Sequence, residues 1–390
     1  MNTKAGAICL SLGFTVSFAV QAAILTVTNT NDNGPGSLRQ ALVNANVGDT
    51  IDATGVSGVI TITSGKLLVN RSVTINGAGA DLLAVDGNGS RTVFDVESIG
   101  PVTISDITIK NAHGNFGGEI FNGGVGTLTI IDGALSGNTA NDGGAVYNGG
   151  TLNVVNSTIS GNTAATEAAG IYNAVTLTII NSTFSNNGAQ IAGAIFNSRT
   201  LVITNSTITN NRSVFLAGGV VNLNNFQIGN TILNEGPASA NIYNNSSGLV
   251  MSRGYNLSSD DAFGILTGPG DQIQTDPKLA PLQNNGGHTL RHALLPGSPA
   301  IDAGDPNFTP RPSFDQRGPG FLGIVGGRID KGAFEVQNGG KATPTPTVTP
   351  GSTPSPTATP KATATPKPSP TSTPGFTPTP TATSTHRRRH

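Results

Sequence analysis

The stretch GGAVYNGGTLNVVNSTISGN, Gly143 to Asn162, decides the fold, because its few large residues recur at a regular spacing. The triplet VYN has counterparts of the form IFN, IYN or VVN. With it, they end at Asn122, Asn148, Asn173, Asn197, Asn222 and Asn244. The successive intervals are 26, 25, 24, 25 and 22 residues. A period of this length predicts a stacked repeat fold.

Two further columns have the same period. The first column holds the Asn that begins each NST or NTI triplet, and in the two preceding units an Asp takes this position. Its members are Asp106, Asp132, Asn156, Asn181, Asn205 and Asn230. The second ends SGN and its variants, at Asn138, Asn162, Asn186 and Asn210. Regular Asn columns predict that each Asn stacks on its equivalent and passes a side-chain hydrogen bond along the stack.

Several repeat folds have units of similar length. A leucine-rich repeat needs a helix or an extended turn, but the half-unit GGAVYNGGT lacks the amphipathic stripe of a helix. Calcium-binding nonapeptide repeats need an Asp in each short unit, and propeller blades need four strands. The sequence therefore predicts an all-β coil in which every short strand pairs in parallel with its copy about 4.8 Å away. We expect roughly eight or nine coils within residues 23–260.

The ends of a solenoid need covering, because an exposed coil end invites aggregation. Ser37 is a candidate N-cap with Gln40 three residues later, which predicts a short capping helix. Its apolar face would consist of Leu38, Ala41, Leu42 and Ala45. Residues 261–340 break the period and form a predicted C-terminal capping region. Its apolar residues available to cover the last coil are Leu279, Leu282, Leu290, Leu294, Leu295 and Ile301.

Both termini differ in composition from the repeats. Lys4, an apolar run and the small residues before Ala23 predict a signal peptide over residues 1–22, which contains the chain's single cysteine, Cys9. Residues 341–390 alternate Pro with Thr, Ser and Ala and end in HRRRH, which predicts a disordered, extended tail. No later segment has the apolar length of a membrane helix.

The charge pattern limits the partners. The formal net charge is -1 and the body has no basic stripe, which argues against nucleic acid binding. We expect an exported monomer without cysteine-based metal sites or disulfides in the mature chain.

Three segments carry a resemblance to known families. LTVTNTNDNGPGSLRQALVNANVGDTI, residues 25–51, resembles the segment that opens many exported bacterial β-helix proteins. The GGAVYN and STISGN units are similar to polymorphic outer membrane protein repeats, and FSNN, residues 184–187, matches their FxxN element. Residues 276–335 resemble the choice-of-anchor Q domain. These resemblances imply a right-handed, single-stranded, pectate-lyase-like parallel β-helix at a bacterial surface or beyond.

Catalytic candidates are two aspartates of one column. Asp106 and Asp132 would lie one strand spacing apart, close enough to raise one pKa or to bind Ca²⁺. If the chain is an enzyme, they are the predicted acid and base. The alternative is that both replace Asn in a turn ladder. His113 and Glu119 are interpreted as solvated loop residues rather than an acid–base pair.

The C-terminal region offers a candidate calcium site. Four carboxylates would suit this hard cation: Asp302, Asp305, Asp315 and Asp330. The alternative is that they close turns and pair with Arg317.

A third candidate site is aromatic. The column contains Phe121, Tyr147, Tyr172, Phe196 and Tyr243. Facing outward, Tyr147, Tyr172 and Phe196 would bind sugar rings or a protein; facing inward, the column would be stacked core, which we favour.

The sequence as a whole predicts a secreted or cell-surface β-helix protein. We expect a non-catalytic role in adhesion, with an extracellular polysaccharide or a surface protein as partner. The alternative is a polysaccharide lyase or glycoside hydrolase that acts on an acidic polysaccharide.

Overall fold

The structure, a computed structural model, describes residues 21–90, 92–236 and 239–337. The predicted signal peptide lies outside the described residues except for Gln21 and Ala22, and the Pro-rich tail lies wholly outside them. The coils and the C-terminal region belong to one compact unit. None of the helices in the described part of the chain is long and apolar enough to cross a bilayer.

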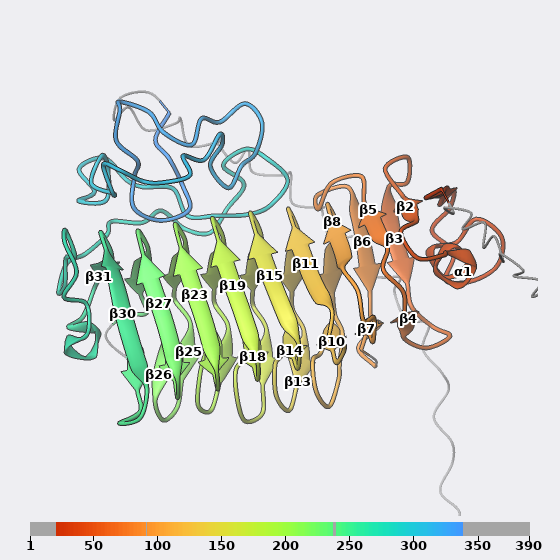
Figure 1. Cartoon of the computed structure of the whole chain (residues 1–390), viewed down its shortest axis with the longest axis horizontal. Helices are drawn as coiled ribbons and strands as arrows, with labels where there is room; N and C mark the ends of the chain where they lie inside the picture. Colours follow the sequence, from red (N-terminus) through yellow and green to blue (C-terminus); the bar gives the residue numbers. More distant parts are fainter. Residues whose placement is uncertain (1–20, 91, 237–238, 338–390) are drawn as a thin grey trace, which may run out of the picture. The chain divides into compact units, whose positions relative to one another are not determined.

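The chain winds into coils whose strands form four sheets (Figure 1). Sheet 1 contains β1 (Ile24–Thr26), β2 (Thr50–Asp52), β5 (Thr74–Asn76), β8 (Val102–Ser105), β11 (Thr127–Ile131), β15 (Thr151–Val155), β19 (Thr176–Ile180), β23 (Thr200–Thr204), β27 (Asn225–Gly229) and β30 (Leu249–Gly254). Sheet 2 contains β4 (Leu67–Val69), β7 (Phe94–Val96), β10 (Ile120–Asn122), β14 (Val146–Asn148), β18 (Ile171–Asn173), β22 (Ile195–Asn197), β26 (Ala217–Asn222) and β29 (Ala240–Asn244).

The other two sheets complete each coil. Sheet 3 contains β3 (Gly58–Thr61), β6 (Leu83–Asp86), β9 (Thr108–Lys110), β12 (Ala134–Ser136), β16 (Thr158–Ser160), β20 (Thr183–Ser185), β24 (Thr207–Thr209), β28 (Ile232–Asn234) and β31 (Leu257–Ser258). Sheet 4 contains β13 (Thr139–Ala140), β17 (Thr163–Ala164), β21 (Gly188–Ala189) and β25 (Arg212–Ser213). A middle coil passes through sheets 1, 3, 4 and 2 in turn. The predicted all-β, right-handed parallel β-helix is confirmed, with about 9 turns.

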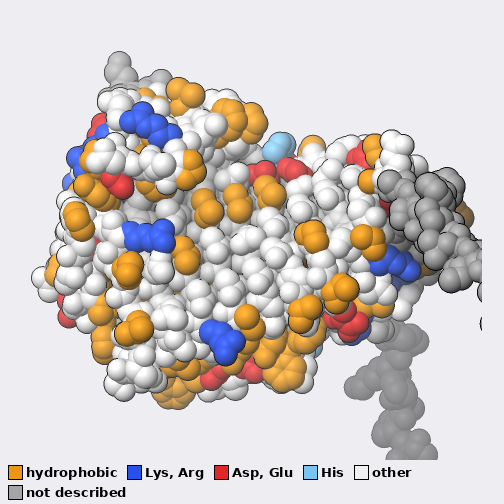
Figure 2. Space-filling model, viewed as in Figure 1, with side chains coloured by type: hydrophobic (Ala, Val, Ile, Leu, Met, Phe, Trp, Pro, Cys, Tyr) orange, Lys and Arg blue, Asp and Glu red, His pale blue; other side chains and the backbone are white. Residues whose placement is uncertain are grey.

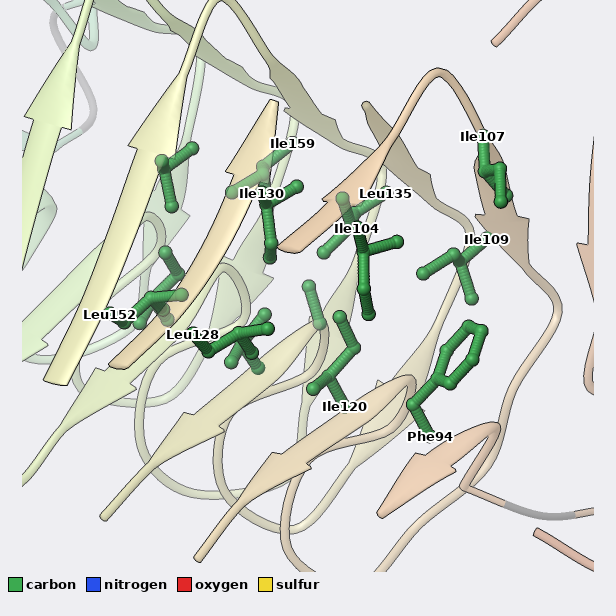
Figure 3. Packing of buried hydrophobic residues seen from close by; sticks show 14 of the residues in the cluster. Phe94, Ile104, Ile107, Ile109, Ile120, Leu128, Ile130, Leu135, Leu152 and Ile159 are labelled. Atoms are coloured by element: carbon green, nitrogen blue, oxygen red, sulfur yellow. The ribbon is translucent and has the colours of Figure 1, made fainter. Parts of the chain in front are cut away.

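Like residues stack on like residues, as the repeat predicts. In the pairing of β11 with β15, Leu128 lies opposite Leu152. Alternate residues of these strands point into the bore and the others point outward. Figure 3 shows Leu128, Ile130, Leu135 and Leu152 directed into the bore from sheets 1 and 3. The apolar bore supplies the main driving force for folding in a chain with little charge.

Sheet 2 ends in a ladder of buried Asn side chains. The amide of Asn122 donates to Asn148 at 2.7 Å, and Asn148 donates to Asn173 at 2.8 Å. The same pattern continues through Asn197, Asn222 and Asn244. The predicted stacking of the first Asn column is confirmed.

A second buried ladder corrects the column predicted from SGN and its variants. Its members are Asn138, Asn162, Asn187 and Asn211, and it ends on the carboxylate of Glu235. The predicted members Asn186 and Asn210 were therefore wrong by one residue. They lie instead in register with Gly137 and Gly161, and all four have a positive φ between 58° and 69°. Asn replaces Gly there because its short polar side chain tolerates the left-handed region.

The N-terminal cap matches its prediction. Helix α1 (Leu38–Asn44) has Ser37 as its N-cap, and the Ser37 hydroxyl accepts a hydrogen bond from the Gln40 backbone N–H at 3.1 Å. The predicted apolar face, Leu38, Ala41, Leu42 and Ala45, is buried in the main core.

The C-terminal region does not form a simple plug for the last coil. Ala262, in the 3₁₀ turn η1 (Ala262–Gly264), and Leu266 join the main core at the end of the bore. Residues 276–337 lie across sheet 3 and contact several coils (Figure 1). Of the predicted covering residues, Leu294 packs with Ile232 and Leu257, whereas Leu290 and Leu295 are exposed.

Candidate functional site

One column of residues forms the corner between sheets 1 and 3. This corner column consists of Asp106, Asp132, Asn156, Asn181, Asn205 and Asn230. Each member has a φ between 50° and 57°, a conformation that Asn and Asp adopt more readily than other side chains. Asn230 donates to Asn205, Asn205 to Asn181, and Asn181 to Asn156, at 2.6, 3.0 and 2.8 Å. The corner is therefore a third amide ladder.

The two aspartates continue this column toward the N-terminus. The Asp106 backbone N–H bonds to Ile131 in the next coil, so Asp106 and Asp132 follow each other at one strand spacing, about 4.8 Å. Both side chains are half-buried, and burial raises the pKa of each. The neighbouring Asp106 raises the pKa of Asp132 further, whereas a hydrogen bond from Asn156 lowers it. Asp132 therefore continues the column beside Asn156, which fits the turn-ladder interpretation.

An unforeseen ion pair lies beside these aspartates. His288 Nδ1 lies 2.6 Å from Asp81 Oδ1, and a positive charge on His288, when it is protonated, also lowers the pKa of Asp106 and Asp132. A Cβ on Gly79 would lie 2.8 Å from His288 Nδ1, so the approach depends on that glycine. Asp81 and His288 are 207 residues apart, and no local pattern signals their contact.

A groove runs along the Asn part of the corner column. Residues 308–314, the roof segment, cover it, and its volume is about 380 Å³. Amides and hydroxyls line one side, from Asn156, Asn181, Asn205, Thr178 and Thr204. Apolar surface comes from Ile180, Val202, Phe308, Pro310, Pro312 and Phe314, and positive charge comes from Arg253 and Arg311. The sequence analysis identified the corner column but did not predict that residues 308–314 cover it.

The groove opens on a broad polar surface. Uncharged polar side chains and backbone cover most of the sheet 1 face (Figure 2). A smaller cavity of about 130 Å³ lies beside the groove and shares Arg253 and Phe308 with it. Asp305 lines this second cavity. Amide, hydroxyl, ring and guanidinium groups together can bind hydroxyl-rich ligands.

Three of the four candidate calcium ligands, Asp305, Asp315 and Asp330, accept hydrogen bonds from protein groups. Asp315 forms a buried ion pair with Arg317 at 2.5 Å, which confirms the predicted pairing for that residue. Asp330 accepts backbone hydrogen bonds from Asp302 and Val336, and burial raises its pKa to about 6. Asp305 accepts from the Asn307 N–H. The described residues contain no group of three His, Cys, Asp or Glu suited to a metal ion. Calcium binding stays a prediction.

The aromatic column lies on the outer side of sheet 2, which corrects the expectation that it is stacked core. Phe121, Tyr147 and Tyr172 are half-buried, and Phe196 belongs to a small cluster separate from the bore. Successive ring centroids are 5.6, 4.9 and 5.2 Å apart, with interplanar angles of 3° to 15°. The rings cover one another's faces, so Tyr147 and Tyr172 present mainly edges to a ligand.

Glu119 also differs from its prediction. It was expected to be solvated, but its side chain is 0% exposed and contacts the Asn138 amide. The preceding coil has Ala112 rather than Asn in register with Asn138, and the Glu119 carboxylate accepts from the Asn138 amide at this end of the ladder. Burial raises its pKa well above the ordinary value. His113 is exposed, as predicted.

Comparisons with known proteins give little beyond the fold. No family model matches the chain, and no curated protein matches it. Among solved structures, the chain is similar to the crystal structure of pectate lyase Pel9A, with a TM-score of 0.42 and 16% identity. The match covers 81% of this chain and 97% of that one. A likeness this distant assigns no activity.

Proposed function

We propose that this chain is a secreted or cell-surface protein that binds a polysaccharide without cleaving it. The proposal rests on the groove under the roof segment. Its amides repeat at the coil spacing of about 4.8 Å, so a linear polymer lying along the corner column would meet an equivalent donor and acceptor at each coil. The location is proposed from two sequence-based predictions, the signal peptide over residues 1–22 and the resemblance of residues 276–335 to a surface-protein domain.

The ladder leaves hydrogen-bonding capacity for such a ligand. The amides of Asn181 and Asn205 each use one N–H and one oxygen lone pair along the column, and each has a second N–H and a second lone pair. Phe308 and Phe314 supply apolar surface for the C–H groups of a sugar ring. Sugar binding at the groove therefore accounts for its mixed lining better than binding of a purely apolar ligand.

Binding can be tested with the purified chain and a set of polysaccharides by isothermal titration calorimetry. The variant Asn181→Ala would remove the central amide of the groove floor, and Asn197→Ala would remove an equally buried amide of the sheet 2 ladder. We expect only the first to weaken binding beyond its effect on stability. Absence of binding to every polymer, or equal loss in both variants, would refute the proposal.

Glycoside hydrolysis is the second candidate function. Asp106 and Asp132 lie one strand spacing apart, near the carboxylate separation of about 5 Å used by retaining glycosidases. Their raised pKa values favour a proton donor at one of them. A lyase is less well supported, because the nearby Arg291 is fully buried and its guanidinium binds backbone carbonyls.

Reducing-end release and the absorbance of unsaturated products separate these activities. New reducing ends that disappear in Asp106→Asn and Asp132→Asn variants would establish hydrolysis. Unsaturated products would establish elimination instead. We expect neither from the wild-type chain, because Asp106 and Asp132 occupy the same corner position, with the same backbone conformation, as the asparagines of the column.

A further inference from the structure

We propose that the groove selects sugars that carry a carboxylate, so that its ligand is a polyuronate rather than a neutral glycan. This inference rests on the proposed function and names the substrate class of the same site. It depends on two arginines, Arg253 and Arg311, which both line the groove. Arg253 extends from β30, and Arg311 belongs to the roof segment.

The positive charge of the groove is not neutralised by its lining. The lining contains no Asp or Glu. Within the described residues, neither Arg253 nor Arg311 forms an ion pair, and the guanidinium of Arg253 contacts only the neutral amide of Gln227. Two other arginines of the described chain do form ion pairs: Arg39 with Asp32, and Arg317 with Asp315. The groove arginines are therefore available for an anion.

A guanidinium recognises a carboxylate better than a hydroxyl. Its planar fork donates two parallel hydrogen bonds to the two carboxylate oxygens, and such charge-assisted bonds are stronger than neutral ones. The roof segment shields this contact from solvent on one side, which strengthens the attraction over that of a fully exposed pair. Neutral sugars would keep the hydroxyl contacts with the Asn floor but gain nothing from the arginines.

Acidic residues limit where an anionic polymer can lie. Asp132 and Asp106 follow Asn156 at one end of the corner column, and Asp305 lines the cavity beyond Arg253 at the other. The favourable stretch spans Asn156 to Asn205, which is two coil spacings or roughly 10 Å. We expect a short segment of the polymer to bind there, with one or two carboxylates at the arginines.

The test compares two polymers with the same backbone. Polygalacturonate and its fully methyl-esterified form are titrated into the full chain at low ionic strength. The chain is the wild type or carries Arg253→Gln, Arg311→Gln or Arg199→Gln. Arg199 is exposed and does not line the groove, so its variant removes one positive charge elsewhere. Thermal unfolding of each variant controls for loss of structure.

Selection predicts that the wild type binds polygalacturonate at least about tenfold more tightly than the ester, the effect of one charge-assisted contact. Arg253→Gln and Arg311→Gln each remove most of this preference, and Arg199→Gln retains it. Equal affinity for the two polymers, or equal loss with all three variants, would overturn the selection while leaving sugar binding intact. Failure to bind either polymer or any neutral glycan would overturn the proposed function itself.

Discussion

Replacing Asn187 by alanine tests how the buried ladder stabilises the coil. The Asn187 side chain accepts from the Asn162 backbone N–H at 3.1 Å and from the Asn162 amide at 2.9 Å. It donates to the Ile159 carbonyl at 2.9 Å and to Asn211 at 2.8 Å. The side chain is fully buried, so water cannot replace these bonds. At about 1 kcal/mol for each of the four bonds, the free energy of unfolding falls by roughly 4 kcal/mol.

The neighbouring residue provides a matched control. Asn186 is exposed, has a φ of 58° and lies in register with glycines of the preceding coils. Asn186→Gly is therefore expected to change the free energy of unfolding by less than about 0.5 kcal/mol. Urea unfolding followed by far-ultraviolet circular dichroism measures both variants. Similar effects of the two substitutions, or a loss below about 1 kcal/mol for Asn187→Ala, would refute the assigned register.

Three further predictions concern charge. Burial raises the pKa of Glu235 from 4.5 to about 8. Its contribution to stability is therefore largest below pH 4.5 and falls as the pH rises toward 8. In urea titrations, Glu235→Gln should lose less stability than the wild type between pH 5 and pH 8. Asp132→Asn would place another amide in the corner column and remove a half-buried negative charge. The free energy of unfolding at pH 7 should therefore rise, and polygalacturonate should bind about twofold more tightly, which is the size of a usual surface charge effect. A loss of affinity instead would place the polymer on the aspartates. Asp315→Ala would leave Arg317 buried without its partner and lower stability by about 3 to 5 kcal/mol, with faster hydrogen exchange in residues 313–336 before the coils.

The sequence predicted the parts of the fold that repeat. A residue in one coil meets its equivalent in the next, so a column of Asn in the sequence becomes a ladder in space. This rule placed Asn148 over Asn173, and a separate local pattern placed the helix N-cap at Ser37. It failed by one residue at Asn186, because units of 24 and 25 residues alternate and adjacent asparagines satisfy either register.

The candidate site was less predictable, because it depends on contacts outside the repeat. Asp81 meets His288 across 207 residues, and the roof segment reaches Asn181 from the C-terminal region. Glu119 was misplaced for a related reason. Its side chain is buried because it points to the end of the ladder and accepts from the Asn138 amide, although its neighbours in sequence are typical of a loop. Composition reports solvation on average and does not give the direction of one side chain.

A crystal structure of the chain with a tri-galacturonate bound would test the central claim most directly. The account predicts sugar density under residues 308–314, along Asn156 to Asn205, with a carboxylate within hydrogen-bonding distance of Arg253 or Arg311. Density confined to Asp106, Asp132 and His288, or to the aromatic column of sheet 2, would contradict it.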